Sequence, residues 1–252
     1  MAYRRIFLIA LALCFAVPAA AQTYPDRPIR LIAPFPAGGL ADVLARAVGD
    51  EMAKALGQPI IVENRAGAGG NTGADAVAKS APDGYTLLMA SAGILTANPF
   101  IYATMPFDAE TAFVPVSNVA TMSMLVVVNP NVEAKTLGEF VALAKARPGK
   151  INFGSPGIGT TGHLGLAMLM YAAGINITHV PYRGAAPALT DLLAGQIDGV
   201  VDNPPTVLAH IHSGKLRPLA LAAKQRLPLF PDMTMDEVDE VCGALKEILH
   251  PR

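Results

Sequence analysis

The sequence predicts an α/β protein made of two similar lobes that share a cleft. Short apolar runs alternate with Ala- and Leu-rich amphipathic segments, which is the pattern of parallel sheets flanked by helices. A Gly-rich loop joins a strand to a helix at residues 34–39, and a loop of the same kind recurs at residues 155–162 in the second half of the chain. The 252 residues, 52% of them hydrophobic, are enough for a large core.

The first strand, loop and helix lie at residues 29–57. Residues 29–33 are a short apolar run, as expected for a buried strand, and the Pro- and Gly-rich loop that follows can continue neither a strand nor a helix. A helix is expected at residues 40–56, with Gly57 as its C-cap. The free N–H groups of the loop and of the first helical turn favour an anion. Two interpretations stay open: an ordinary βα turn, or a site for the carboxylate of a small molecule.

The rest of the first half repeats this layout. Two more strands are expected at residues 58–64 and 85–90, each followed by a loop at the same edge of the sheet. Between them lie a second Gly-rich loop at 65–73 and a helix at 74–79, and a third loop begins at Ser91. Ligands of open α/β sheets bind at this edge, outside the carboxyl ends of the strands. Residues 98–107 show no clear periodicity.

The second half is expected to form the second lobe. Residues 113–120 and 125–128 are predicted strands and candidates for the hinge between the lobes. The elements predicted after them are a helix at 137–146 capped by Thr136, a strand at 150–154, a helix at 163–173, a strand at 177–181, a helix at 186–193, a strand at 197–203, a helix at 204–213 and a strand at 216–222. His163 falls in the first turn of its helix, where the helix dipole disfavours imidazolium, so a neutral ring that donates one hydrogen bond is expected.

The N-terminus carries an export signal. Arg4 and Arg5 form a basic region, residues 6–17 are apolar, and residues 19–21 supply a small-residue cleavage site. Cleavage is expected after Ala21.

Charge and cysteine content limit the partners. Nineteen Lys and Arg against 20 Asp and Glu give a net charge of −1, which argues against a nucleic-acid partner. Of the two cysteines, Cys14 leaves with the signal, so Cys242 has no intrachain partner.

No cofactor or metal is predicted. The loop at 65–73 has Thr72 where the dinucleotide fingerprint needs its third glycine, and no acidic residue ends the next strand. His210 and His212 stand two apart on a predicted helix, so they do not share a face as metal ligands require.

A hydrolase-like enzyme on the same cleft is the alternative function. Ser155 with His163 and either Asp198 or Asp202 supplies the residue types of a catalytic triad. Phe153, however, stands where a nucleophile elbow needs its first glycine. We therefore expect binding without catalysis and assign no catalytic residue.

Several blocks, in the right order between residues 24 and 232, resemble Bug-type periplasmic solute-binding receptors of tripartite tricarboxylate transporters. The blocks are YPxRPI at 24–29, PFPAGGxxD at 34–42, ENRxGAGG at 63–70, PDGYTLL at 82–88, GTxxHL at 159–164, VPYRG at 180–184, ALTDLLAGQ at 188–196 and GKLR at 214–217. The resemblance implies a two-lobed periplasmic-binding-protein (Venus-flytrap) fold. It also implies a periplasmic monomer that captures a small organic acid and passes it to membrane permease subunits.

The resemblance also implies ligand-binding residues. The loops at 37–40 and 155–161 are expected to clamp carboxylates, partly through water. With the third loop and the hydroxyl and imidazole groups near the second clamp, the candidates are Ala37, Gly38, Gly39, Ser91, Ser155, Gly159, Thr160, Thr161, His163 and Asp202. Asp202 matches a family position near the ligand, where it meets an amino group, a hydroxyl group or water and helps select the substrate. Its alternative role is to cap the helix that starts at Pro204.

The expected organisation is a signal peptide at 1–21, lobe 1 at 22–122, lobe 2 at 123–222 and a C-terminal segment at 223–252. In the family, the chain crosses back to the first lobe at this point. Here residues 234–249 read as an acidic amphipathic helix, so the C-terminal part is expected to be truncated or replaced. Low stability or impaired closure is then expected, and a non-functional shortened receptor is the further alternative.

Overall fold

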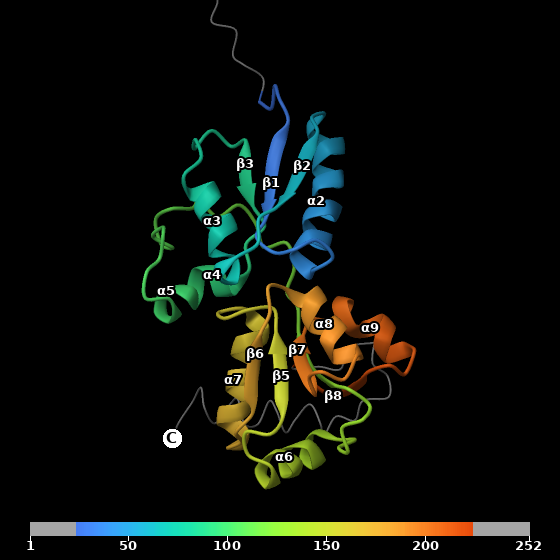
Figure 1. Ribbon diagram of the computed structural model, residues 1–252. Helices are drawn as coiled ribbons and strands as arrows, with labels where there is room; N and C mark the ends of the chain where they lie inside the picture. The colour runs from blue at the N-terminus through green and yellow to red at the C-terminus, as the bar shows by residue number, and fades with distance from the viewer. Residues whose placement is uncertain (1–23, 224–252) are drawn as a thin grey trace, which may run out of the picture.

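Two separate sheets organise the computed structural model, which describes residues 24–223 (Figure 1). We call the part around the first sheet lobe 1 and the part around the second sheet lobe 2. The sheet of lobe 1 has three parallel strands in the order β2-β1-β3. The sheet of lobe 2 has five strands in the order β6-β5-β7-β4-β8.

Lobe 1 follows the predicted repetition of strand, loop and helix. Its elements are β1 (Ile29–Ala33), α2 (Leu40–Leu56), β2 (Ile60–Asn64), the 3-10 turn η1 (Ala68–Gly70), α3 (Asn71–Ala78), β3 (Thr86–Leu88), α4 (Ala92–Thr96) and α5 (Asn98–Ile101). Helix α2 has the predicted bounds because Gly57 takes a left-handed conformation and its N–H donates to the Ala53 carbonyl. The central strand β1 pairs in register with both neighbours, so all three strands end at the same edge.

Lobe 2 packs helices on both faces of its sheet. Its elements are β4 (Met124–Val128), α6 (Leu137–Ala146), β5 (Asn152–Ser155), α7 (Thr161–Ala173), β6 (Thr178–Pro181), α8 (Ala185–Leu193), β7 (Gly199–Asp202), α9 (Pro204–His212) and β8 (Arg217–Ala222). Thr136 caps α6 as predicted, because its side chain accepts a hydrogen bond from the Glu139 N–H.

The prediction of parallel sheets is wrong for β4, which runs antiparallel to both β7 and β8. Strand β4 runs in this direction because of the place at which the chain enters lobe 2. The chain arrives from lobe 1 at Met124, on the side of the cleft between the lobes, so the first strand of lobe 2 runs away from the cleft. Strands β5, β6 and β7 run toward it and end there.

Three further expectations are corrected. Residues 113–120 form no strand, since Pro115 cannot donate to a ladder and no described strand lies alongside; Val114 is 89% exposed. Residues 125–128 are no hinge, because β4 is a central, buried strand of lobe 2. The loop predicted at Ser91 is the start of α4.

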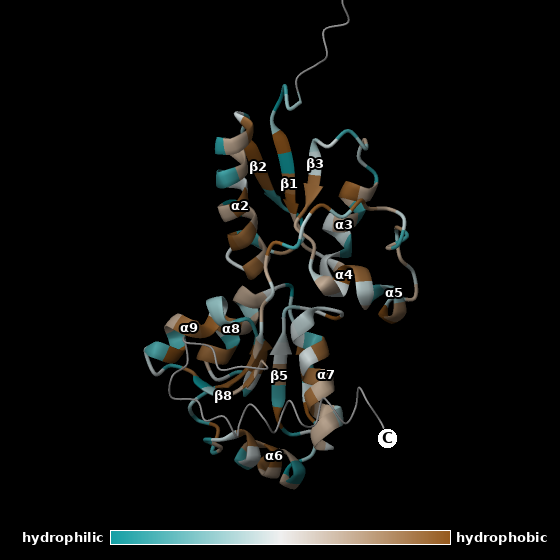
Figure 2. Cartoon of the chain, turned by 180° about the vertical axis from the view of Figure 1, so that it is seen from behind, coloured by the Kyte–Doolittle hydropathy of each residue, from teal (hydrophilic) through white to brown (hydrophobic). Residues whose placement is uncertain are grey.

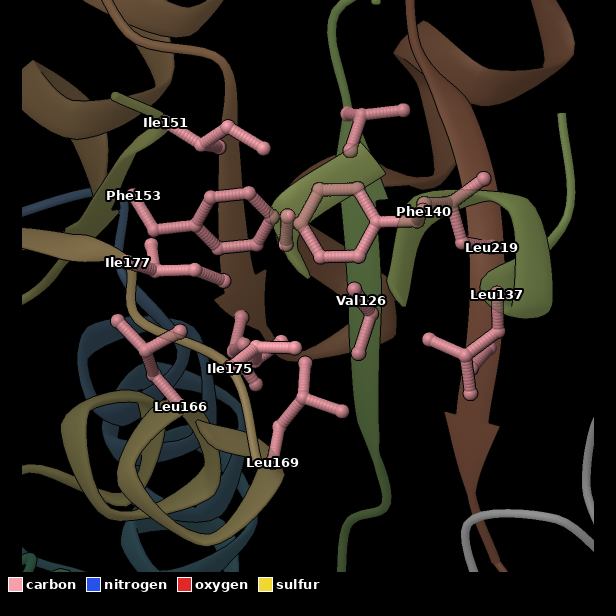
Figure 3. Packing of buried hydrophobic residues seen from close by; sticks show 14 of the residues in the cluster. Val126, Leu137, Phe140, Ile151, Phe153, Leu166, Leu169, Ile175, Ile177 and Leu219 are labelled. Carbon is pink, nitrogen blue, oxygen red and sulfur yellow. The ribbon is translucent and has the colours of Figure 1, made fainter. Parts of the chain in front are cut away.

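The main core of the molecule lies in lobe 2. Alternate residues of β4 face opposite sides of the sheet: Val126 and Val128 pack under α6 and α7, whereas Leu125 and Val127 pack under α8 and α9. Figure 3 shows the first cluster, in which the rings of Phe140 and Phe153 meet with their centroids 5.3 Å apart. Within residues 24–223, no helix has the length and apolarity needed to cross a membrane.

Phe153→Ala tests this core. Phe153 is fully buried, so its truncation leaves a cavity beneath α6 and α7 and is expected to lower the free energy of unfolding by about 3–5 kcal/mol. Urea unfolding followed by circular dichroism measures the change. Tyr171→Ala is the matched control, since Tyr171 on α7 is 75% exposed, and its effect should stay within about 0.5 kcal/mol. Equal losses in the two variants would contradict this packing.

Candidate functional site

A cavity of about 420 Å³ lies between the two lobes. Helices of both lobes begin at its wall: α2 and α4 from lobe 1, and α7, α8 and α9 from lobe 2. The residues that line it at these helix starts are Gly39, Leu40, Ala41, Ser91, Ala92, Thr160, Thr161, Ala185, Ala186, Asp202 and Asn203. The cavity therefore lies outside the carboxyl ends of the parallel strands, where the sequence places a ligand.

The lobes touch each other beside this cavity (Figure 1). The Tyr102 hydroxyl in lobe 1 donates to the Ile158 carbonyl of lobe 2 at 3.0 Å. A Cβ atom on Gly184 of lobe 2 would lie 2.7 Å from the Pro36 ring of lobe 1, so the Gly184 backbone approaches that ring closely there as well. The structure is thus a closed arrangement of the two lobes around the cavity.

Asp42 holds the loop in front of α2. Its carboxylate is buried and accepts hydrogen bonds from Gly38 N–H at 2.9 Å and from the Asn64 amide at 2.9 Å, and it pairs with Arg46 at 2.9 Å. Burial alone would raise the pKa of Asp42, but the bonds from Arg46, Gly38 and Asn64 outweigh it and hold that pKa below its usual value. The Asp42 carboxylate therefore already occupies part of the anion-binding region at the N-terminus of α2.

The next N–H groups of α2 face the cavity. Leu40 and Ala41 line it, and their N–H groups have no acceptor among the described residues, because Asp42 N–H is the first to bond back, to the Gly39 carbonyl. Of the predicted residues in this loop, Gly39 lines the cavity. Ala37 and Gly38 do not line it, and the Gly38 N–H is already used by Asp42.

The start of α7 supplies the opposite wall. Thr160 lines the cavity and its hydroxyl donates to the Gly157 carbonyl at 2.7 Å, which fixes the loop before the helix. Thr161 also lines the cavity. Its N–H and hydroxyl groups have no partner within residues 24–223. The two clamping loops of the sequence prediction thus open onto one shared space.

Ser155, Gly159 and His163 lie behind this wall and do not line the cavity. The Ser155 hydroxyl is buried and meets His179 Nε2 at 2.6 Å. Gly159 N–H donates to His163 Nδ1 at 3.2 Å, and the His163 ring stacks on that of His179 with centroids 4.4 Å apart. These residues shape the loop that carries Thr160 and Thr161.

The pKa values of both histidines are lowered, which favours their neutral rings. Burial lowers the pKa of His163, and burial together with the nearby His163 lowers the pKa of His179 to about 4. The expected neutral state of His163 agrees with this direction, and because Nδ1 accepts the Gly159 N–H, the one donor of the neutral ring is Nε2–H.

The triad of the hydrolase alternative is not assembled. Ser155 pairs with His179 instead of His163 and is fully buried, so its hydroxyl does not face the cavity. The Asp198 carboxylate accepts a hydrogen bond from the Asn152 N–H at 2.7 Å, at the other end of β5.

Within the described part of the chain, Asp202 is the one charged residue that lines the cavity. Burial raises the pKa of Asp202, although hydrogen bonds from Asn203 and Thr206 oppose the shift. The Asp202 residue lines the cavity, and its carboxylate accepts a hydrogen bond from the Asn203 N–H at 2.8 Å. Asn203 itself is the N-cap residue of α9, so Asp202 lies one residue before the cap. Ser91 lines the opposite side, and its buried hydroxyl has no hydrogen-bond partner within the described residues.

The apolar walls of the cavity and the contribution of the start of α8 to it were not predicted from the sequence. Phe35, Leu44 and Met89 of lobe 1 line the cavity, as do Met122 of the connection into lobe 2 and Met124 at the start of β4. Ala185 and Ala186 at the start of α8 line it as well. The block at 180–184, which ends just before α8, was the signal that could have indicated this third helix of lobe 2.

Comparison with known proteins identifies relatives over most of the chain. The model of the tripartite tricarboxylate transporter family receptor matches residues 44–246. Protein BugT of Bordetella pertussis is 42% identical over 225 residues, which cover 88% of this chain and 69% of BugT. Across BugT and two further curated relatives, the aligned part covers 63–71% of the relative's length.

Solved structures share the fold. The periplasmic binding protein BugD superposes with a TM-score of 0.77 at 32% identity, covering 90% of this chain and 85% of BugD. MatC from Rhodopseudomonas palustris with bound malate superposes with a TM-score of 0.78 at 28% identity, again over 90% of this chain and 85% of MatC. The two-lobed periplasmic-binding-protein fold expected from the sequence is thereby confirmed. The expected departure at residues 223–252 falls, apart from Ala223, outside the described residues.

Stability should fall as the pH is lowered from about 6.5 toward 4. In the unfolded chain His179 titrates near 6.5, whereas in the folded chain its pKa is about 4, so the unfolded state binds more protons in this interval. Urea unfolding at a series of pH values measures the free energy. His179→Gln should flatten the dependence, and His212→Gln, at an exposed position on α9, should leave it unchanged. A dependence that is unaffected by His179→Gln would contradict the neutral stacked pair.

Proposed function

The chain belongs to the tripartite tricarboxylate transporter receptor family, and we propose that its cleft captures a small carboxylate-bearing metabolite for delivery to the membrane permease subunits of such a transporter. The observation that carries this proposal is that backbone N–H groups from both lobes, with no acceptor within residues 24–223, belong to residues that line one cavity: Leu40 and Ala41 of α2, and Thr161 of α7.

The chemistry of the cavity favours an organic acid. Among the described residues no Lys, Arg or His lines it, so the charge of a carboxylate would be met by N–H groups and helix dipoles. Apolar side chains such as Phe35, Met89 and Met122 suit the hydrocarbon part of the ligand. A volume of about 420 Å³ is within the range of small-molecule sites. MatC, with malate bound, supports a ligand of this class.

The closed arrangement explains how a ligand is retained. An acid that accepts hydrogen bonds from α2 at one side and from α7 at the other joins the two lobes, so binding favours closure. Among the predicted residues, we assign ligand contact to Gly39, Ser91, Thr160, Thr161 and Asp202, which line the cavity. We assign a supporting role behind the cavity wall to Gly38, Ser155, Gly159 and His163.

We also propose the setting in which the receptor works. Its relative BugD is a periplasmic binding protein, and an export signal cleaved after Ala21 agrees with that location. Within it, the protein is proposed to act as a monomer that binds its ligand and returns it chemically unchanged.

A ligand screen tests the function itself. Purified protein is heated with di- and tricarboxylates, acidic amino acids and aromatic acids, and a raised melting temperature identifies the ligand. NMR of the same mixture should then show the ligand chemically unaltered. Turnover of the ligand would favour the enzyme alternative, and stabilisation by none of the acids would contradict the proposal.

Leu40→Pro tests how much the backbone N–H group of Leu40 contributes to the affinity for the ligand. Proline is tolerated at the first position of a helix, and Gly39 before it already has the extended backbone that proline requires. The variant loses one N–H group that faces the cavity. Affinity for the acid found in the screen should fall by roughly tenfold or more, because a hydrogen bond to a charged group contributes about 1.5–3 kcal/mol. Calorimetric titration measures it.

Leu40→Ala is the control for the lost side chain. It shortens the same residue but keeps the N–H group, so its affinity should stay close to that of the unchanged protein. The same affinity in both variants would show that the α2 N–H group does not contact the ligand.

Asp202→Asn tests selection by charge. A buried carboxylate repels a ligand with two negative charges and favours an ammonium group on it. The variant should therefore bind malate better relative to aspartate, which carries an ammonium group where malate has a hydroxyl. Calorimetric titration of both acids gives the ratio of affinities. Asp50→Asn, on the exposed side of α2, is the control and should leave the ratio unchanged. If Asp202→Asn leaves the ratio of malate to aspartate affinity unchanged, Asp202 does not select the ligand by its charge.

A further inference from the structure

Two residues of lobe 2 reach lobe 1 beside the ligand cavity. They are Ile158 and Gly159, which directly precede Thr160 and Thr161, and we call this pair the latch. Helices α4 and α5 of lobe 1 face the start of α7 across the boundary between the lobes (Figure 2). Within lobe 2 the Gly159 N–H donates to His163 Nδ1 at 3.2 Å. The latch does not line the cavity, so its contact with lobe 1 is separate from the ligand site.

Lobe 1 receives the latch on a surface formed largely by glycine backbone. A Cβ atom on Gly69 would strike the Ile158 carbonyl oxygen, and one on Gly93 would strike the Gly159 carbonyl oxygen. The Tyr102 hydroxyl donates to the Ile158 carbonyl at 3.0 Å. This surface, which we call the socket, consists of Gly69, Gly93, Asn98 and Tyr102. The fit of the latch therefore depends on positions without a side chain.

Closure has a cost at Asn98, the first residue of α5. Its side-chain amide donates to Asn71 Oδ1 at 2.6 Å, which fixes Asn98 within lobe 1. Its own Oδ1 is buried without a hydrogen-bond partner among residues 24–223, and a Cβ atom on Gly159 would strike it. When the lobes part, water can reach this oxygen, so opening restores a hydrogen bond that closure removes. The latch is thus able to release.

Gly93 is the socket residue at which closure can be changed without disturbing lobe 1. It lies inside α4 and its backbone is not left-handed, so alanine is compatible with its conformation. Outside its own helix, the three atoms nearest to a Cβ atom at this position belong to Gly159 and Thr160 of lobe 2. A methyl group here would therefore obstruct the closed arrangement without a clash inside lobe 1.

We propose that Gly93 and Tyr102 are positioning residues for ligand binding, because they seat the latch in the socket. Since the latch directly precedes Thr160 and Thr161, these two residues are thereby held at the cavity wall. Neither Gly93 nor Tyr102 lines the cavity, so both act through the latch. This inference rests on the proposed function of the cleft and deepens it. An acid meets both lobes only when the latch is seated, so the population of the closed arrangement sets the affinity.

A paramagnetic label on lobe 1 tests the latch in protein without ligand. In protein carrying Cys14→Ser, Cys242→Ser and Phe100→Cys, the one thiol lies on α5 at a position where Phe100 is 89% exposed. A nitroxide attached there should broaden the amide signals at the start of α7, because these helices face each other when the lobes are closed. Adding Gly93→Ala should lower the ratio of closed to open protein roughly tenfold, as expected for an overpacked contact, and thereby reduce the broadening.

Two further variants complete the test. Gly138→Ala is the matched control: it is the same substitution on α6, where a Cβ atom meets nothing within 4 Å, so the broadening should not change. Tyr102→Phe keeps the ring, loses one hydrogen bond and should lower the ratio of closed to open protein about fivefold. The melting temperatures of the ligand-free variants should stay within about 4 °C of the parent protein, which separates loss of the latch from loss of the fold.

Calorimetric titration connects the latch to ligand binding. Malate, the acid bound to MatC, is the probe, and the acid found in the screen replaces it if malate does not bind. The affinities of Gly93→Ala and Tyr102→Phe should fall in proportion to their closed populations, because the acid selects the closed arrangement. Gly138→Ala should bind the same acid as tightly as the unchanged protein.

Two results would overturn the inference while the proposed function stands. One is unchanged broadening in Gly93→Ala, and the other is an acid bound by Gly93→Ala as tightly as by the unchanged protein. If the unchanged protein binds no acid of the screen, the proposed function fails, and the positioning role fails with it.

Discussion

One buried carboxylate sets the geometry on which the rest of the cleft depends. Asp42 accepts hydrogen bonds from the loop at Gly38 and from Asn64 at the end of β2, and it pairs with Arg46 on α2. Loop, sheet edge and helix are thereby joined at a single point. Because Asp42 already satisfies the N–H group of Gly38, the N–H groups left for an external anion are those of Leu40 and Ala41. The protein's own anion thus decides which donors a ligand meets.

In lobe 2 the loop before α7 is held by side chains without a carboxylate. Ser155, His179 and His163 lie behind the wall and fix the loop whose far side carries Thr160 and Thr161. Asp42, Ser155 and His163, whose side chains hold these loops, do not line the cavity, whereas the residues at the starts of α2 and α7 do. Contact between the lobes also depends on missing side chains, because a Cβ atom on Gly93 or Gly159 would strike the opposite lobe. Closure and ligand capture therefore use the same loops.

The sequence predicts those parts of the fold that are set locally. Gly39 and Gly57 bound α2, Thr136 caps α6, and both clamping loops lie before helices that open onto one cavity. The direction of β4 was not predictable, since an apolar run has the same periodicity in either direction and only the point of entry into lobe 2 decides it. Nor can periodicity show whether a hydrogen-bonding group already has a partner within the protein. Gly38 and His163 were therefore predicted as ligand residues, although the Gly38 N–H bonds to Asp42 and His163 Nδ1 accepts from Gly159. Asp42, four residues after Gly38, is the signal in the sequence that the loop supplies its own anion.

The central claim is that backbone N–H groups of both lobes hold one acid without changing it. Amide chemical shifts in uniformly labelled protein test it most directly during titration with a stabilising carboxylate. The account predicts that the amides of Leu40, Ala41 and Thr161 shift together with a single affinity, and that the ligand is recovered intact. Shifts confined to one lobe, or a ligand altered by the protein, would contradict it.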